Sequence, residues 1–162
     1  MKVLSDMEML DAPDDKYGMK AAYLIPDTPR ADIKPGQAGV TMVPINRMVP
    51  RSFITNLGAG VKLKARSATT IRGLAMGGDC GVAKVEVSAD GGQTWIDAKL
   101  GRDEGPYSFR QWTTRMPMSD SGNAVLAARC TNTKGEVQPD AANWNASGFM
   151  RNVSARLPVP VT

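Results

Sequence analysis

Apolar and polar residues alternate along much of residues 58–162, and this two-residue period is typical of half-buried β-strands. Turn residues separate about seven such segments, as expected for short antiparallel strands. The segments cover residues 61–66, 69–75, 82–88, 95–100, 107–114, 124–131 and 153–161. No convincing helical spacing interrupts them, and Pro158 and Pro160 mark the last segment as an edge strand, because proline donates no ladder hydrogen bond. The pattern predicts an all-β fold, an antiparallel β-sandwich of immunoglobulin-like type.

Residues 1–57 show no comparable period and are rich in proline. The prolines that interrupt any helix or long strand are Pro13, Pro26, Pro29, Pro35, Pro44 and Pro50. Two short runs, residues 23–25 and 42–45, are too apolar for a simple solvated linker and favour contact with another surface. We therefore predict an extended proline-rich arm over residues 1–57 and a sandwich domain over residues 58–162.

The composition argues against a self-sufficient enzyme. The 162 residues contain no histidine, which excludes a Ser–His–Asp or Cys–His nucleophile system, a histidine-ligated metal and a histidine acid or base. Two cysteines cannot supply a four-ligand zinc site by themselves. We assign no catalytic, cofactor-binding or metal-binding residue to this chain.

The charge pattern narrows the class of partner. The net charge is +4, but the basic residues are spread without a tract, which argues against nucleic-acid binding. A mildly basic surface can still help to dock an acidic partner protein. No apolar run reaches the ~18–20 residues of a membrane span, and the first residues lack the apolar stretch of a signal peptide. We expect either a cytoplasmic protein or a chain that does not start at the native beginning of its gene product.

The two cysteines leave two interpretations open. Cys80 lies in a glycine-rich loop, and Cys130 lies in a predicted strand. They could form a disulfide, whose geometry the sequence does not test. We favour the other interpretation, in which Cys130 is a buried structural thiol and Cys80 is unpaired.

The segment from Val85 to Trp95 predicts a hairpin. Asp90 can bond its own turn backbone, Gly92 can take a positive φ, and Trp95 can pack back over the strands. The residues also fit the Asp-box pattern, which sialidase-type propellers carry in several copies. Since this chain has one copy, a structural turn is favoured over a glycan site.

The aromatic residues suggest an alternative function. Tyr107, Phe109, Trp112 and Trp144 either pack in the core or form an exposed recognition surface. An exposed cluster would fit a stand-alone immunoglobulin-like module that binds a protein or a glycan. Packing in the core is the favoured interpretation for a sandwich of this size.

Basic residues in the proline-rich part are candidates for contact with another domain. Arg47 and Arg51 flank Met48, and arginine either binds an anionic group through paired hydrogen bonds or forms a salt bridge to a neighbouring domain. We favour the salt bridge. The residues predicted to contact another domain or a partner are Arg47, Met48, Arg51, Trp144, Asn145 and Arg151.

Taken in order, the motifs of the chain resemble one family. The matching motifs in the strand-rich part are Ile71–Ala75, Gly77-Gly78, residues 82–95, Tyr107–Trp112, Ala128–Asn132, Gly135–Pro139, Trp144-Asn145 and Gly148–Val153. Together they resemble the C-terminal dimerisation domain of the sulfite oxidase family of molybdopterin oxidoreductases. Residues 17–26 and 44–54 resemble the end of the catalytic domain in bacterial sulfite or sulfane dehydrogenases.

The resemblance implies a homodimerisation and docking domain, with residues 1–57 as the tail of an absent catalytic domain. In that family the preceding domain holds a molybdenum cofactor through a cysteine thiolate and a pterin dithiolene. It oxidises sulfite or a sulfane sulfur by oxygen-atom transfer and passes electrons to a haem, often of a c-type cytochrome. The resemblance also implies that the parent enzyme is periplasmic and that this chain alone is non-catalytic.

The chain departs from the family pattern at several positions. Neither Cys80 nor Cys130 occupies the molybdenum-binding motif, so no metal ligand is carried over. Ser147 stands where the animal branch has an arginine of the substrate pocket, and Gly18 replaces a tryptophan frequent in bacterial relatives. One alternative is that the chain is a subunit whose catalytic half is a separate polypeptide.

Overall fold

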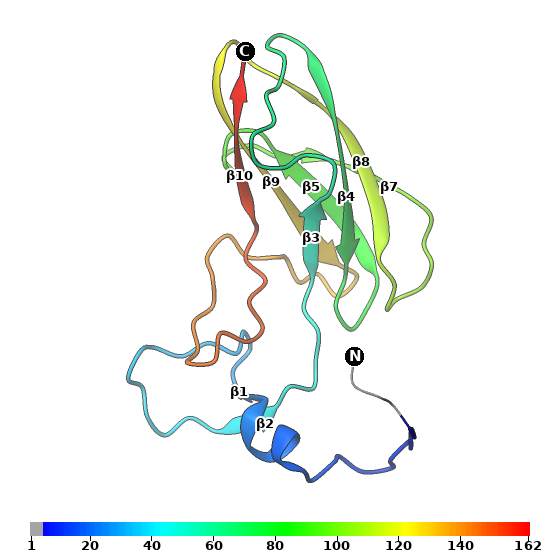
Figure 1. The fold of residues 1–162 in the computed structure, drawn as a ribbon, viewed down its shortest axis with the longest axis vertical. Coiled ribbons are helices and arrows are strands. Elements are labelled where there is room, and N and C mark those ends of the chain that lie inside the picture. Colours follow the sequence, from blue (N-terminus) through cyan, green and yellow to red (C-terminus); the bar gives the residue numbers. More distant parts are fainter. Residues whose placement is uncertain (1–4) are drawn as a thin grey trace. The chain divides into compact units, whose positions relative to one another are not determined.

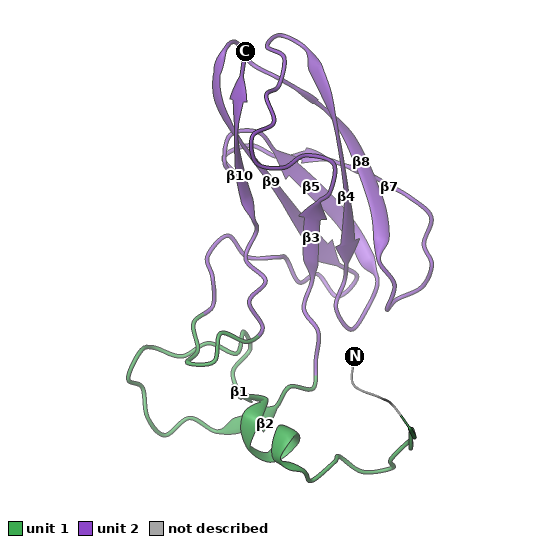
Figure 2. Cartoon of the chain, viewed as in Figure 1, with its two compact units in different colours: residues 1–46, 144–149 green, residues 47–143, 150–162 purple. Residues whose placement is uncertain are grey.

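The computed structural model describes residues 5–162 and contains two compact units (Figure 2). Unit 1 comprises the residues up to Asn46 together with Trp144–Phe149, and unit 2 comprises Arg47–Asn143 and Met150–Thr162. The chain therefore leaves unit 2 once, between its last two strands, and returns to it. Within residues 5–162, no helix has the length and apolar character needed to cross a membrane.

Unit 2 is built from two four-stranded antiparallel sheets (Figure 1). The first, called here the β4–β8 sheet, has the order β3 (Arg51–Ile54), β4 (Ala68–Met76), β8 (Arg110–Pro117), β7 (Lys99–Leu100). The second, the β5–β9 sheet, has the order β10 (Arg156–Val161), β9 (Gly122–Asn132), β5 (Val82–Ser88), β6 (Ile96–Asp97). The predicted all-β fold with antiparallel sheets is confirmed, and the arrangement is consistent with an immunoglobulin-like β-sandwich.

The alternation read from the sequence places one side of each strand in a common core. In β4, Ile71, Gly73 and Ala75 are buried between exposed or half-buried neighbours. The Trp112 side chain of β8 is only 2% exposed and packs against Gly73. The core residues come from both sheets and from Leu63 and Met118; among the most deeply buried are Ile71, Val85, Val87, Leu126, Cys130 and Val159.

The segment predicted as one strand over residues 95–100 is two strands, and that prediction was wrong. Ile96–Asp97 pairs with β5, whereas Lys99–Leu100 pairs with β8 in the other sheet. The switch falls at Ala98, whose N–H donates to the carbonyl of Val85 at 2.8 Å. One stretch of chain thereby closes one side of the sandwich. A strand that changes sheets keeps its side-chain alternation, so the pattern did not show the break.

The first predicted strand, residues 61–66, is also corrected. Its alternation is real, with Leu63 buried, but the segment forms only an isolated parallel bridge to Val161. The N–H of Leu63 donates to the carbonyl of Pro160, and the N–H of Thr162 donates to the carbonyl of Leu63. The last strand, β10, is at the end of its sheet as predicted: β9 pairs along one side, and the other side forms only the bridge to Leu63.

Unit 1 contains little regular structure, as its prolines dictate. A five-residue π-helix, η1 (Gly18–Ala22), precedes a two-stranded antiparallel sheet of β1 (Leu24–Pro26) and β2 (Met42–Pro44). That residues 1–57 form an arm lying on another domain stays a prediction, as does the boundary at residue 57. Strand β3, which lies within that range, pairs with β4 in unit 2.

Candidate functional site

The segment that enters unit 2 before β3 is fixed by side chains from distant parts of the chain. The N–H of Met48 donates to Oδ1 of Asp79 at 2.9 Å. The carbonyl of Pro50 accepts from Nδ2 of Asn152 at 3.1 Å, and the N–H of Ser52 donates to Oε1 of Gln138 at 2.8 Å. We call residues 48–52 the anchored segment, since it is held at three points.

The loop that carries Asp79 also approaches the anchored segment closely. Gly78 has a φ of 87°, in the left-handed region. A Cβ at this position would meet the backbone carbonyl of Met48. Glycine is therefore required at position 78 for two reasons, its backbone conformation and the close approach of the two segments.

Of the residues predicted to contact another domain, Arg51 and Arg151 are brought together. Nη1 of Arg51 donates to the carbonyl of Arg151 at 3.1 Å, and its guanidinium lies 4.9 Å from the centre of the Phe53 ring. Met48 is 51% exposed on the same segment, and Arg47 precedes it half-buried. These four residues lie in unit 2, and whether they contact another domain stays a prediction.

Trp144 and Asn145 lie in unit 1 and are separate from that group. Asn145 is buried, and its Nδ2 donates to the carbonyls of Ala31 and Phe149, both at 2.9 Å. Its Oδ1 accepts from the N–H of Phe149. The amide thus ties an excursion of the β9–β10 connection to the rest of unit 1. The Trp144 ring is 44% exposed, and the backbone carbonyl of that residue accepts from the N–H of Ile33.

The polar side chains of the predicted turn form hydrogen bonds within the turn itself. The Asp90 carboxylate accepts from the side chain and backbone N–H of Thr94, from the hydroxyl of Ser88 and from the N–H of Gln93. Those hydrogen bonds, led by the Thr94 hydroxyl, hold the pKa of Asp90 well below its ordinary value. Nε1 of Trp95 donates to the carbonyl of Gly92 at 3.0 Å. These contacts are those of a structural turn.

A charged pair beside this turn joins two strands of the β5–β9 sheet. Nε of Arg129 in β9 donates to Glu86 in β5 at 2.9 Å, and its guanidinium lies 4.2 Å from the Trp95 ring. Burial alone raises the pKa of Glu86, but hydrogen bonds from Arg129 and Lys84 outweigh it and lower the pKa overall. The pair holds Trp95 in place over the sheet.

Both cysteines are free thiols and both are buried, so the favoured interpretation of Cys130 agrees with the structure. Sγ of Cys130 contacts the carbonyl of Met76 at 3.5 Å, and Sγ of Cys80 contacts that of Gly77 at 3.8 Å. Burial, followed by the proximity of Cys80, raises the pKa of Cys130 to about 12. A thiol in this environment stays protonated and is a poor nucleophile and metal ligand.

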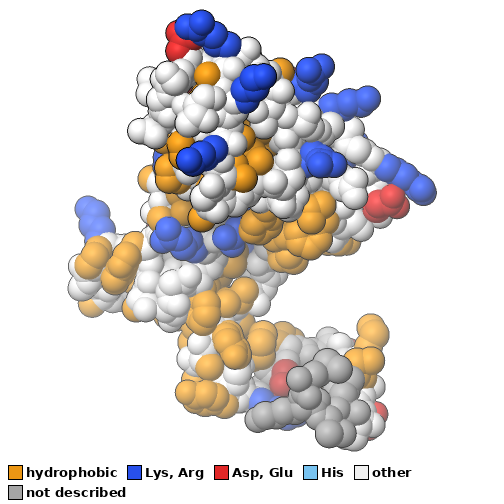
Figure 3. Space-filling model, turned by 45° about the horizontal axis from the view of Figure 1, so that its top comes forward, with side chains coloured by type: hydrophobic (Ala, Val, Ile, Leu, Met, Phe, Trp, Pro, Cys, Tyr) orange, Lys and Arg blue, Asp and Glu red, His pale blue; other side chains and the backbone are white. Residues whose placement is uncertain are grey.

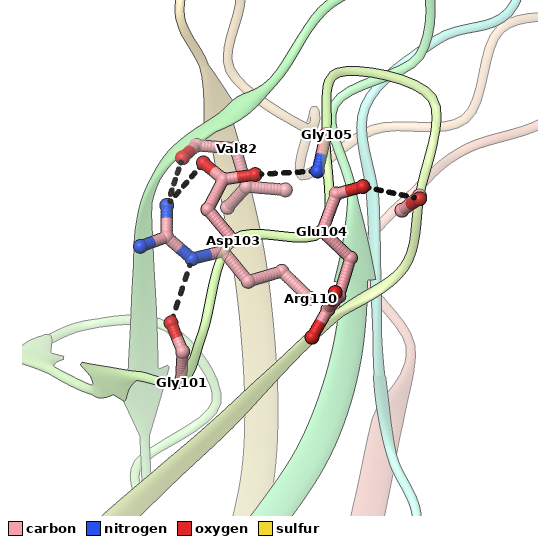
Figure 4. A network of polar contacts seen from close by, with 7 residues as sticks. Val82, Gly101, Asp103, Glu104, Gly105 and Arg110 are labelled. Carbon is pink, nitrogen blue, oxygen red and sulfur yellow. Dashed lines mark hydrogen bonds and ion pairs between the residues drawn. The ribbon is translucent and has the colours of Figure 1, made fainter.

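Sequence reasoning missed the residues that join the two sheets. Arg110, in β8, donates from Nε to the carbonyl of Gly101 at 3.0 Å and from Nη1 to the carbonyl of Val82 in β5 at 3.1 Å (Figure 4). The same Nη1 lies 3.2 Å from Asp103 in the loop before β8. A half-buried arginine at the start of a strand gives no local sign of such a role.

A small apolar hollow lies between edge strands β3 and β10. Its volume is about 240 Å³. It is lined by Ser52, Phe53, Ile54, Leu57, Ala128, Ala155, Arg156 and Leu157. The chain crosses this side between β3 and Leu63, whose N–H donates to Pro160 of β10, and the lining side chains of Ile54, Leu57 and Leu157 remain half-buried. The hollow is therefore a candidate contact surface.

Comparison with known proteins gives consistent matches. A family model described as the Mo-co oxidoreductase dimerisation domain matches residues 43–162. Mitochondrial sulfite oxidase of Homo sapiens is 35% identical over 126 residues, which are 73% of this chain and 23% of that protein. Nitrate reductase (NADH) 1 of Oryza sativa subsp. japonica is 30% identical over 130 residues, 72% of this chain and 14% of that protein. The chain thus spans less than a quarter of either relative.

Among solved structures, the sulfane dehydrogenase SoxCD from Paracoccus pantotrophus matches with a TM-score of 0.68. The match covers 89% of this chain and 36% of that chain, at 22% sequence identity. At that identity the match shows a shared fold. It extends beyond the sandwich, because 89% of the chain includes part of unit 1.

Proposed function

This chain belongs to the Mo-co oxidoreductase dimerisation domain family, and we propose that it joins two copies of a molybdenum enzyme into a homodimer while docking the catalytic domain of each copy. The family match over residues 43–162 carries the proposal, because it covers the whole sandwich together with the segment that enters it. The proposal uses two parts of the structure: the apolar hollow for contact between copies and the anchored segment for docking the catalytic domain.

The surface proposed for contact between copies is the apolar hollow between β3 and β10. A two-fold contact places the same patch on both copies, so the patch must be complementary to itself. Apolar side chains meet this requirement, since burying them is favourable on both copies. Ile54, Leu57 and Leu157 supply such side chains at the hollow.

The anchored segment is suited to docking. Its three hydrogen bonds to Asp79, Asn152 and Gln138 hold it to two different loops of the sandwich. A segment that is fixed at successive residues keeps the two domains it connects at a defined separation, whereas the ends of a free linker sample many separations. We infer that a catalytic domain preceding this segment is held in a defined place relative to the sandwich.

The parent enzyme in this proposal is of the sulfite oxidase type. Its preceding domain binds molybdopterin, oxidises sulfite or a sulfane sulfur by oxygen-atom transfer, and delivers electrons to a c-type cytochrome in the periplasm. Support comes from the motif resemblance and from relatives that include human mitochondrial sulfite oxidase.

The residues of this chain do not fit the molybdenum group itself. Within residues 5–162, no three His, Cys, Asp or Glu side chains gather in a way that could hold a metal ion. A thiolate ligand is disfavoured at Cys130, because burial raises its pKa to about 12. The proposal therefore assigns the metal to the preceding domain and gives this chain no step in the reaction.

Sedimentation equilibrium of the purified chain tests the dimer. We expect a dimer with a dissociation constant of about 1 µM or tighter, equivalent to about 8 kcal/mol. The variant Leu57→Asp places a charge in the hollow of both copies and is expected to weaken the dimer by about a hundredfold.

Ile96→Asp is the matched control, because Ile96 is a partly exposed apolar residue on β6, at the closed side of the sandwich. It should leave the dimer unchanged. Circular dichroism of both variants checks that they remain folded. A wild-type chain that stays monomeric at about 100 µM would contradict the dimerisation proposal, and equal weakening by both variants would contradict the choice of surface.

A further inference from the structure

The outward face of the β4–β8 sheet carries basic residues and no acidic residue. Its cations are Arg51 on β3, Arg72 on β4, Lys99 on β7 and Arg115 on β8. None of the four strands contains Asp or Glu. The register places Arg72 and Lys99 on either side of Thr113, so both point to the same face.

These cations lack a neutralising carboxylate in the part of the chain that the structure describes. No carboxylate among residues 5–162 forms an ion pair with any of the four. Figure 3 shows Lys and Arg side chains spread over the visible face of the sandwich, with few acidic side chains among them. Like charges held on one face create a positive potential, which attracts an anionic ligand and raises its rate of association.

A groove runs between the cations. Its volume is about 660 Å³, and its apolar side chain is Leu74, since Leu100 and Trp112 pack in or against the core beneath it. Arg72 and Lys99 line the same groove. A groove with an apolar lining and cationic sides suits a ligand that combines apolar side chains with carboxylates.

We propose that this face binds an extended acidic segment of a partner protein. The segment places carboxylates against Arg72 and Lys99 and an apolar side chain in the groove beside Leu74. The proposal is independent of the dimer, because Arg72, Lys99 and Leu74 do not line the hollow between β3 and β10.

Charge argues against a second copy of this chain as the ligand. A two-fold contact through this face would place each cation-bearing surface against an identical one, with no carboxylate to separate them. A single-stranded nucleic acid is also a poorer fit, because its bases need exposed aromatic rings for stacking. The ring of Phe53 on this face is already covered by the guanidinium of Arg51.

Fluorescence anisotropy of a labelled peptide tests the proposal with the full chain at low salt. The probe has about ten residues, an extended length of about 33 Å, in which Asp and Glu alternate with Leu. We expect saturable binding that salt weakens. The double variant Arg72→Gln/Lys99→Gln should lower the affinity by about tenfold or more.

The matched control is Lys62→Gln/Lys134→Gln, which removes the same charge from exposed residues outside this sheet. It should change the affinity less than about twofold. A second probe with Asn and Gln in place of the acids should not bind, and one with Ser in place of Leu should bind several times more weakly.

Several outcomes would overturn the proposal. The first is that the acidic probe does not bind. The second is that both double variants lose the same amount of affinity for it. The third is that an oligothymidylate of equal charge binds more tightly. Loss of the dimer in Arg72→Gln/Lys99→Gln would identify a second copy as the occupant instead. Sedimentation of the same samples tests the two proposals separately. A dimer formed through the hollow should be unchanged in Arg72→Gln/Lys99→Gln, so loss of peptide binding with an intact dimer concerns the acidic-segment proposal alone.

Discussion

The side-chain oxygen of Gln138 accepts a hydrogen bond from the backbone N–H of Ser52 at 2.8 Å, although 86 positions separate the two residues. The same oxygen accepts from the N–H of Cys130 at 3.2 Å. Ser52 belongs to the edge strand of one sheet and Cys130 to a central strand of the other. One buried amide therefore joins the two sheets at the place where the anchored segment enters.

Replacing Gln138 should destabilise unit 2. Gln138→Leu keeps a similar volume but leaves the N–H groups of Ser52 and Cys130 buried without this acceptor. Each unsatisfied buried donor costs about 1–3 kcal/mol, so we expect a loss of about 2 kcal/mol or more in the free energy of unfolding. Urea denaturation measures it. The control is Gln111→Leu at an exposed position, expected to stay within about 0.5 kcal/mol.

A single methyl group at Gly73 should have a large effect. The Cβ of Gly73→Ala would overlap the carbonyl of Phe53 and the Trp112 ring, and both are held by the sheet and the core. Overpacking of this kind costs about 1–3 kcal/mol. Gly58→Ala is the control, because its Cβ has open space around it. Thermal unfolding should show a clear loss for Gly73→Ala alone, and equal melting temperatures would refute the packing argument.

The stability of the Ser88–Trp95 turn should depend on pH through Asp90. Its folded-state pKa lies below the ordinary value of 3.8, so the carboxylate stabilises the fold above that pH. The contribution is lost as the pH falls from about 4 toward the lower folded-state pKa. We expect Asp90→Asn to be less stable than the wild type at pH 7, with the difference shrinking below pH 4 in denaturant titrations.

A second variant tests whether the pH dependence of stability comes from the turn or from the loss of any carboxylate. Glu8→Gln removes one carboxylate from an exposed residue, and it should leave the pH profile of the wild type unchanged. If Glu8→Gln and Asp90→Asn shift that profile equally, the contribution does not come from the turn.

The thiols should resist alkylation in the folded protein. Both cysteines are buried, and burial together with Cys80 raises the pKa of Cys130 to about 12. Since the thiolate is the reacting form, iodoacetamide at pH 8 should modify neither Cys80 nor Cys130 under native conditions and both in urea. Mass spectrometry of intact and digested protein reads out the sites. Rapid native labelling at Cys130 would contradict the buried environment.

The strands that the sequence predicted well are those whose alternation decides burial directly. In β4, β5 and β9 one side faces the core, so the hydrophobic period and the structure agree. The period carries no information about which neighbour a strand pairs with. For that reason the switch of sheets at Ala98 and the missing ladder at residues 61–66 were not predicted.

The candidate site was predicted less completely, because its contacts join distant segments. In the sequence Gln138 is only one residue of the Gly135–Pro139 motif, and Arg110 reaches Val82 across the sandwich. Of the aromatic residues, Trp112 is in the core, while Tyr107, Phe109 and Trp144 are exposed by 78%, 54% and 44%. A local sequence pattern does not show whether a polar side chain forms a cross-sheet hydrogen bond or is solvated. It also does not show whether an aromatic residue is exposed in a loop or buried.

The two prolines of β10 limit how copies of this protein can associate. The carbonyl of Pro160 faces away from β9 toward Leu63, so the nitrogens of Pro158 and Pro160 face the same outer edge. Neither nitrogen carries a hydrogen, and an incoming strand would find no donors at these positions. Growth of the sheet from molecule to molecule is thereby blocked on this edge. The bond from Leu63 to Pro160 already occupies part of this edge, so contact between copies beside β10 relies on side chains, which favours a closed pair over an endless fibre.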